Sequence, residues 1–279
     1  MRRVVKVFLF LGIFIVIGGA ILLGVGIATH AFNDGREFKE VTHEVTDDFS
    51  NIDLSIITSN VKLEKSTDGH NKVLCTEHEK ITFDVKVEDD TLKIEEKEHY
   101  HWYEKMFVFS FDRNRKFVLY LTESNYNKLN VNIVTGDLEF SDYSFNELKI
   151  NIVTGHIKLT NVVITNELST NITTGSNTLT NVITDKLSLK IVSGGTTLKD
   201  VVVANKLDYK ATTGDLNFEV LDAKDINAEV VTGDITGTIT EKHNFDIKIT
   251  TGKRNVCHDE NGNPFTIKIV TGDVNITLV

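Results

Sequence analysis

The feature that most constrains this chain is a phrase repeated eight times between residues 131 and 279. Each copy holds a short run of mostly β-branched residues, then Thr or Ser, then Gly, as in VNIVTGDLEF and IKIVTGDVNI. Successive glycines lie 19 or 20 residues apart, at Gly136, Gly155, Gly175, Gly194, Gly214, Gly233, Gly252 and Gly272. So regular a period indicates a repeat architecture in which each unit packs on its neighbours.

Each copy also alternates between apolar and polar residues. The third and seventh residues before the glycine are apolar in all eight copies, whereas the fourth is polar in all eight. The alternation resumes after the glycine, as at Leu138 and Phe140. Because period two is the signature of a strand with one buried face, each unit is predicted to be a strand, a corner at the glycine, a second strand and a return.

One such unit cannot bury its apolar face alone, but units stacked in parallel about 4.8 Å apart can. A leucine-rich repeat has a similar period, but it needs a helix or an equivalent segment and an Asn-containing consensus. These copies are rich in Val, Ile and Thr throughout. We therefore predict an all-β fold, a parallel β-solenoid with right-handed coils over residues 131–279, in which residues about twenty apart are vertical neighbours.

Residues 41–130 keep the alternation but lose the regular spacing. The segment IITSNVKL (56–63) resembles a degenerate copy with Ser59 in the place of the glycine, and residues 80–96 read as two strands around Asp89 and Asp90. We predict that residues 41–130 form irregular first coils that cap one end of the stack. At the other end, the final VNITLV is predicted to be a bare edge strand or to be covered by the loop 253–264.

The amino-terminal segment predicts a membrane anchor. Residues 7–28 form an uncharged apolar run that follows Arg2, Arg3 and Lys6. As a helix it would be about 33 Å long, enough to cross a bilayer, and it exceeds the apolar region of a signal peptide. We predict a cytoplasmic tail (1–6), a single transmembrane helix (7–29), a linker (30–40) and an extracytoplasmic remainder, following the positive-inside rule.

The charge beyond this segment is strongly acidic. All 40 acidic residues but only 27 of the 30 basic residues follow residue 6. This balance argues against nucleic acid as a partner and against adsorption on an anionic lipid surface.

Taken together, the apolar amino-terminal run, the segment FVLYLTESNYNKLNVNIVTGDLEF and the copies of Thr-Gly-Asp-apolar-x-apolar resemble a bacterial family. It is the putative-adhesin family with β-strand repeats, a domain of unknown function, and the resemblance covers residues 41–279. Thr122 stands where members often have proline. The resemblance implies an interaction or scaffolding role, in some members beside cell-envelope stress-response systems.

Three groups of residues could carry chemistry. Four corner glycines are followed by an aspartate, and stacked carboxylates can bind Ca²⁺, but turn formation explains this position better. Asn161, Asn181 and Asp200 share one place, six residues after the glycine, and predict a stacked amide ladder. Cys75 and Cys257 lie in distant coils, so they are predicted to be two separate buried thiols.

The segment from residue 98 to residue 111 is rich in aromatic residues. Tyr100, Trp102, Tyr103 and Phe107 are predicted either to contact a partner or to pack over the open end of the core. No catalytic residue, cofactor or metal site is predicted. The chain is therefore predicted to be a non-enzymatic module for a protein or cell-wall glycan partner, with a polysaccharide-acting β-helix enzyme as the alternative.

Overall fold

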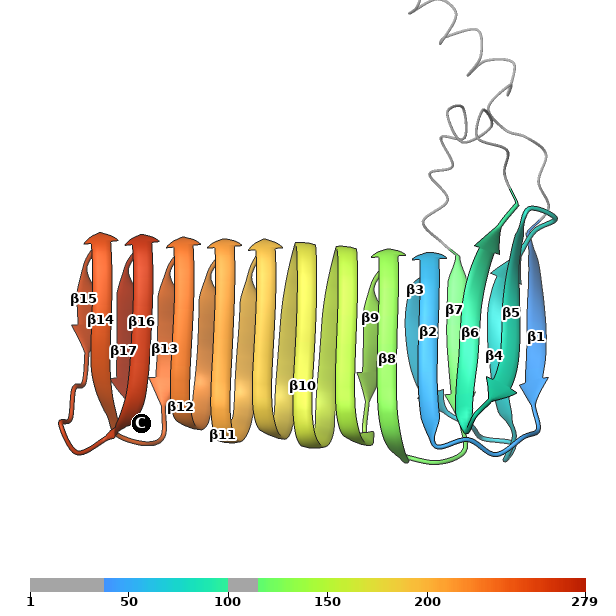
Figure 1. Ribbon diagram of the computed structural model, residues 1–279, viewed down its shortest axis with the longest axis horizontal. Coiled ribbons are helices and arrows are strands. Elements are labelled where there is room, and N and C mark those ends of the chain that lie inside the picture. The colour runs from blue at the N-terminus through green and yellow to red at the C-terminus, as the bar shows by residue number, and fades with distance from the viewer. Residues whose placement is uncertain (1–37, 100–114) are drawn as a thin grey trace, which may run out of the picture. The chain divides into compact units, whose positions relative to one another are not determined.

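The computed structural model describes residues 38–99 and 115–279. Residues 40–98 and 113–279 form one compact unit, and this unit is an all-β solenoid in its described part (Figure 1). Within the described ranges, no helix is long and apolar enough to cross a membrane. The predicted tail, transmembrane helix and most of the linker (1–37) lie outside those ranges, as do Tyr100, Trp102, Tyr103 and Phe107.

The described residues form seventeen strands. They are β1 (Lys39–Val45), β2 (Asn51–Thr58), β3 (Asn60–Lys65), β4 (Asn71–Glu77), β5 (Ile81–Glu88), β6 (Thr91–Glu98), β7 (Lys116–Leu121), β8 (Asn125–Thr135), β9 (Leu138–Ser141), β10 (Ser144–Ser193), β11 (Thr196–Thr213), β12 (Leu216–Thr232), β13 (Ile235–Ile239), β14 (His243–Thr251), β15 (Arg254–Val256), β16 (Asn263–Thr271) and β17 (Val274–Leu278).

The repeats stack in parallel with equivalent positions in register. Ile152 pairs with Ile133, and Leu198 pairs with Leu179, so each residue lies beside the one a repeat earlier. The inward rows are buried, and their Ile, Leu and Val side chains form one continuous core. β10 extends over 50 residues, more than two repeats, because the pairing continues around the corners. The predicted β-solenoid is confirmed, and its handedness stays a prediction.

At the amino-terminal end, the coil made by β2 and β3 is inserted out of chain order. It pairs with the later strands β8 and β9 on one side and with β6 and β7 on the other (Figure 1). Ile56 is in register with Ile133 and Val61 with Leu138, so Ser59 occupies a corner. β5 and β6 form the antiparallel hairpin predicted around Asp89 and Asp90, both of which have positive φ.

A buried carboxylate on β6, in the amino-terminal cap, contacts this inserted coil. Glu96 is 2% exposed, and its Oε2 accepts hydrogen bonds from the backbone N–H groups of Ile57 and Thr58, at 2.8 and 2.9 Å. The guanidinium of Arg115 donates to Oε1 at 3.2 Å. Burial raises the pKa of Glu96 despite these donors. These contacts satisfy the corner amides where the corner residue is Ser59 rather than glycine.

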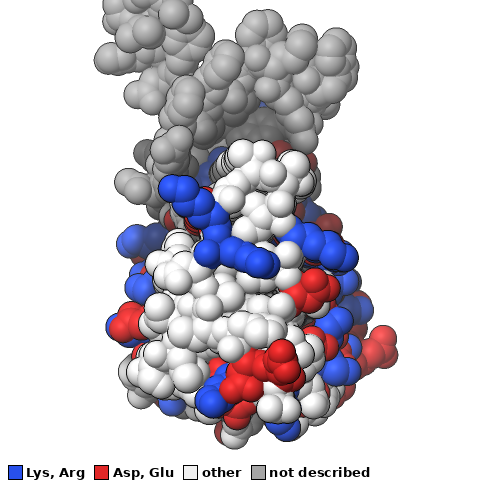
Figure 2. Space-filling model, turned by 90° about the vertical axis from the view of Figure 1, so that its left-hand side faces the viewer, with Lys and Arg blue, Asp and Glu red and all other residues white. Residues whose placement is uncertain are grey.

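At the carboxyl-terminal end, the order of the coils departs from the prediction. β16 pairs with β12 on one side and with β14 on the other, and β17 likewise lies between β13 and β15. The last coil is therefore inserted between the two coils that precede it. The prediction that VNITLV is a bare or loop-covered edge is wrong. β14 and β15 form the terminal coil instead, and uncharged side chains cover much of this end (Figure 2).

The corner glycines form a column in which each lies directly against the next. Their φ angles range from 134° to 155°. A Cβ built on Gly175 would come within 1.7 Å of the carbonyl oxygen of Gly155, and one on Gly272 within 1.9 Å of that of Gly233. Glycine is therefore required by the axial contact as well as by the backbone conformation. At the first coil, Gly136 makes the same contact with the carbonyl of Ser59.

A second corner lies six residues after the glycine. Its residues adopt the left-handed conformation in five successive coils, at Asp142, Asn161, Asn181, Asp200 and Val220, with φ between 51° and 64°. The Asn181 amide donates to the Asn161 side-chain oxygen at 2.8 Å, and the Asn161 amide donates to Asp142 at 2.9 Å. The predicted ladder therefore runs through Asn161 and Asn181. Val220 is the anomaly, because a β-branched residue is strained there.

Replacing Gly175 with alanine is expected to lower the free energy of unfolding by about 3–5 kcal/mol, since the new methyl group meets a backbone oxygen that cannot move alone. Gly195→Ala is the matched control. The nearest atom to its Cβ would be 3.7 Å away, so its effect should stay within about 1 kcal/mol. Chemical denaturation of both variants measures the difference. Similar effects at both positions would contradict the close contact between stacked corner glycines.

Val220→Asn should raise the free energy of unfolding by about 1 kcal/mol. Asparagine tolerates the left-handed conformation, and it would extend the amide ladder from its neighbour in the previous coil. Thermal unfolding measures this gain. The control is Val202→Asn, at an exposed valine without positive φ, where no gain is expected.

The inserted last coil predicts a specific pattern of disulfide formation. Thr232 pairs with Thr271, whereas Thr232 and Thr251 are two strands, about 10 Å, apart. In a Cys257→Ser background, the Thr232→Cys/Thr271→Cys pair should therefore crosslink under mild oxidation, and the Thr232→Cys/Thr251→Cys pair should not. Non-reducing electrophoresis reads both. The opposite pattern would mean that the coils stack in chain order.

Candidate functional site

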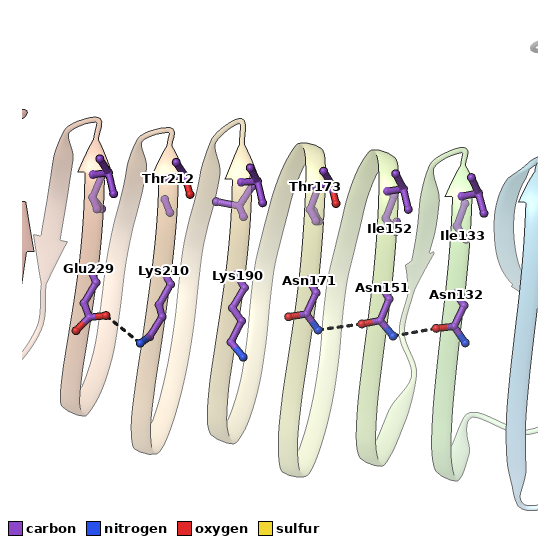
Figure 3. Close-up of a pocket in the computed structure, with 18 of the residues that line it drawn as sticks. Asn132, Ile133, Asn151, Ile152, Asn171, Thr173, Lys190, Lys210, Thr212 and Glu229 are labelled. Carbon is purple, nitrogen blue, oxygen red and sulfur yellow. Dashed lines mark hydrogen bonds and ion pairs between the residues drawn. The ribbon is translucent and has the colours of Figure 1, made fainter.

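A long groove runs along the solenoid, across the strands that precede the corner glycines. Its volume is about 1140 Å³. Two rows of outward side chains border it, four and two residues before the glycine, and the buried row between them lies beneath it. Nine coils contribute, at a spacing of about 4.8 Å, so the groove is about 40 Å long. Figure 3 shows part of it.

The polar row changes character along the groove. From the cap, the spatial order is Ser55, Asn132, Asn151, Asn171, Lys190, Lys210, Glu229, Lys268 and Lys248. The Asn151 amide donates to Asn132 and the Asn171 amide donates to Asn151, each at 2.9 Å (Figure 3). Each amide bond in this ladder leaves the other N–H of its NH₂ group available to a ligand.

The far half of the row is basic. Its four lysines accompany a single carboxylate, Glu229, which lies 2.9 Å from the Lys210 ammonium and 2.8 Å from that of Lys268. Hydrogen bonds from Lys268 and Lys210 lower the pKa of Glu229 to about 2. Within the described part of the chain, Lys190 and Lys248 have no ion-pair partner. A local excess of positive charge therefore lies on a protein whose net charge is −10.

The other row is a stripe of β-branched side chains. It consists, from the cap, of Ile57, Val134, Val153, Thr173, Val192, Thr212, Val231, Val270 and Thr250. Its valines are among the most exposed large apolar residues in the described structure, with exposed fractions from 48% to 51%. Contiguous exposed apolar residues of this kind mark contact surfaces. The groove thus offers an apolar wall opposite a wall of amides and ammonium groups, with the carboxylates of Glu95 and Glu96 at its cap end and that of Glu229 among the lysines.

The aspartates after the corner glycines act within the stack. Asp215 Oδ1 accepts the backbone N–H of Asp234 at 2.8 Å, and Asp234 Oδ1 accepts that of Asp273 at 2.7 Å. Asp137 does the same for His156. Each of these carboxylates therefore fastens the corner of the adjacent coil.

The two cysteines do not pair. Cys75 is buried, as predicted, but Cys257 is exposed, because it follows β15 in the turn that leads to the inserted last coil. The prediction of two buried thiols is therefore wrong for Cys257.

Sequence reasoning missed the groove. Every residue of its rows occupies an outward position of a predicted strand, and the fourth residue before the glycine is polar in all eight copies. The signal that could have revealed the site is the column, read down the repeats: amides first, then lysines, beside an unbroken line of Val and Thr. Because the coils stack in register, a column in the sequence becomes a row on the surface.

Solved structures and one family model resemble this chain. No match was found among curated proteins. Among solved structures, the chain is similar to a putative adhesin from Bacteroides fragilis, with 17% identity and a TM-score of 0.41. It is also similar to a putative lipid binding protein and a putative adhesin from Parabacteroides distasonis, with 16% and 15% identity and TM-scores of 0.45 and 0.46. Each match covers 86% of this chain and 97% of the other.

A family match also covers most of the described unit. Residues 49–277 match a single family, described as Toastrack DUF4097. This range begins just before the inserted first coil and ends within the inserted last coil. The chain therefore belongs to the Toastrack DUF4097 family.

Proposed function

We propose that the protein is an adhesin-like binding module that holds an extended anionic glycan of the cell envelope in its groove. The observation that carries this proposal is the pair of continuous rows, one polar and one apolar, that extend side by side over nine coils. A ligand that contacts both rows along their length must itself be long and unbranched at the contact.

The chemistry of the rows favours a carbohydrate. Sugars present apolar C–H faces and hydroxyl groups, which match a valine stripe opposite a ladder of amides. The rows cross the strands and leave no free backbone edge within the groove, so strand addition by a peptide does not fit this surface. The lysine half adds a preference for acidic groups, since Lys190 and Lys248 have no carboxylate partner within the described structure.

The proposed location follows from the sequence. A helix formed by residues 7–29 would anchor the chain, with residues 1–6 in the cytoplasm and the solenoid in the extracytoplasmic space. An anchored solenoid could also serve as a scaffold, and the family resemblance suggests a place in the envelope stress response. The groove itself supports only the binding role.

Binding is tested with the purified full-length protein and a soluble polyuronate, used as a model acidic glycan. The variant Lys190→Gln/Lys248→Gln should weaken binding roughly fivefold to thirtyfold, because two unpaired charges are removed, and wild-type binding should weaken as salt rises. Calorimetry or biolayer interferometry at two ionic strengths measures this. Lys186→Gln/Lys224→Gln removes the same charge outside the groove and should bind like the wild type.

A second pair of variants tests the apolar wall. Val192→Asp should abolish binding, whereas Val163→Asp, at an exposed valine outside the groove, should not. Equal loss in both, or binding that none of these changes affects, would contradict the proposal. Release of new reducing ends from the polyuronate would instead favour the alternative of a polysaccharide-acting enzyme.

A further inference from the structure

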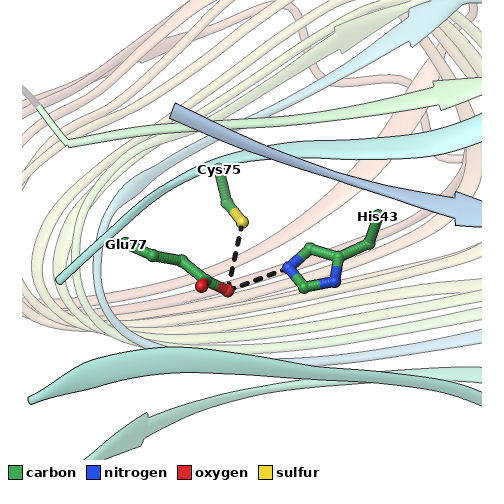
Figure 4. Close-up of side chains that lie close together, drawn as sticks. All are labelled: His43, Cys75 and Glu77. Atoms are coloured by element: carbon green, nitrogen blue, oxygen red, sulfur yellow. Dashed lines mark hydrogen bonds and ion pairs between the residues drawn. The ribbon is translucent and has the colours of Figure 1, made fainter. Parts of the chain in front are cut away.

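Three side chains of different chemistry meet in the cap, away from the groove. They are His43 on β1 and Cys75 and Glu77 on β4 (Figure 4). Cys75 and Glu77 are two residues apart on one strand and so share a face, and β1 pairs with β4. The imidazole Nε2, the thiol sulfur and a carboxylate oxygen all lie within 4.8 Å of one another.

The distances between these atoms suit a shared cation. His43 Nε2 lies 2.8 Å from Glu77 Oε1, and the Cys75 sulfur lies 3.8 Å from the same oxygen. Two ligands on one tetrahedral Zn²⁺ are separated by roughly 3.3–3.8 Å, given bond lengths of about 2.0–2.3 Å. Small side-chain rotations would therefore bring all three atoms to bonding distance.

The surroundings already hold the ligands in place. The backbone N–H of Phe83 on β5 donates to Glu77 Oε1 at 3.0 Å, which orients the carboxylate from outside the cluster. The Cys75 side chain is wholly buried, whereas the side chains of His43 and Glu77 are 29% and 17% exposed. The cluster is thus buried on one side and open to solvent on the other, so an ion can enter and a water can complete its coordination.

The local field is negative. Burial, and then the nearby carboxylates of Glu77 and Glu96, raise the pKa of the Cys75 thiol to about 12. A divalent ion would compensate both carboxylate and thiolate, and metal binding would release the thiol proton.

We propose that His43, Cys75 and Glu77 bind one divalent cation of the Zn²⁺ class, with water as the fourth ligand. A thiolate, an imidazole and a carboxylate together select zinc over the harder Mg²⁺ and Ca²⁺. The ion would join β1, the first described strand, to β4 within the cap.

The competing explanation is a polar triad that only hydrogen-bonds. Metal content and metal chemistry separate the two. The purified full-length protein, freed of metal by chelation and dialysed against Zn²⁺, should retain one equivalent. In Co²⁺ it should show a thiolate-to-cobalt charge-transfer band in the near ultraviolet. Cys75→Ser should lose the band, whereas Cys257→Ser, which changes the exposed thiol, should keep it.

Two further variants guard against simple unfolding of Cys75→Ser. His43→Gln changes a half-exposed side chain and should weaken zinc binding at least tenfold, and Glu77→Gln should do the same. His156→Gln, at an exposed corner histidine in the solenoid, should leave it unchanged. Absence of the cobalt band from the wild type, or zinc binding that persists equally in Cys75→Ser and His43→Gln, would overturn the proposal.

Discussion

The structure depends on the axial contact between successive coils. Backbone hydrogen bonds set the spacing at about 4.8 Å, and at that spacing the corner of one coil rests on the carbonyl of the next. No side chain fits between them, so the corner must be glycine wherever another coil corner lies on that side. The same stacking also buries the inward rows of Ile, Leu and Val side chains. Glycine therefore recurs in the sequence because the same steric limit recurs at each coil along the axis.

The two ends of the solenoid differ from its middle in the order in which the coils stack. At each end one coil is inserted between two coils that follow one another in the sequence. The inserted coil consists of β2 and β3 at the cap and of β16 and β17 at the opposite end. A solenoid with chain-ordered ends can lose its last coil without disturbing others. Here the coil that comes last in the sequence, β16 and β17, is hydrogen-bonded on both sides. Removing it would also detach the coil at the end of the stack, β14 and β15. The insertions therefore couple the chain ends to coils that are distant in sequence.

Much of the fold could be predicted from the sequence, because the residue pattern within each repeat indicates where its strands and corners lie. The strand alternation, the corner at Gly136 and the degenerate corner at Ser59 were all readable locally. The order of the last two coils was not, since all copies share one pattern and any of them can stack on any other. The same holds for His43 and Cys75, which lie 32 residues apart on strands whose pairing nothing in the sequence specifies. The groove was readable only as a column across repeats.

This division explains where function can arise in such a molecule. Inward positions and corners are fixed by packing, so they carry little information beyond the fold. Outward positions are free to vary, and stacking converts variation at one position of the repeat into a gradient along the surface. The row from Asn132 to Lys248 changes from amides to lysines in this way, while the row beside it consists of β-branched residues throughout. Specificity for a long ligand can therefore change one coil at a time, without altering the backbone that presents it.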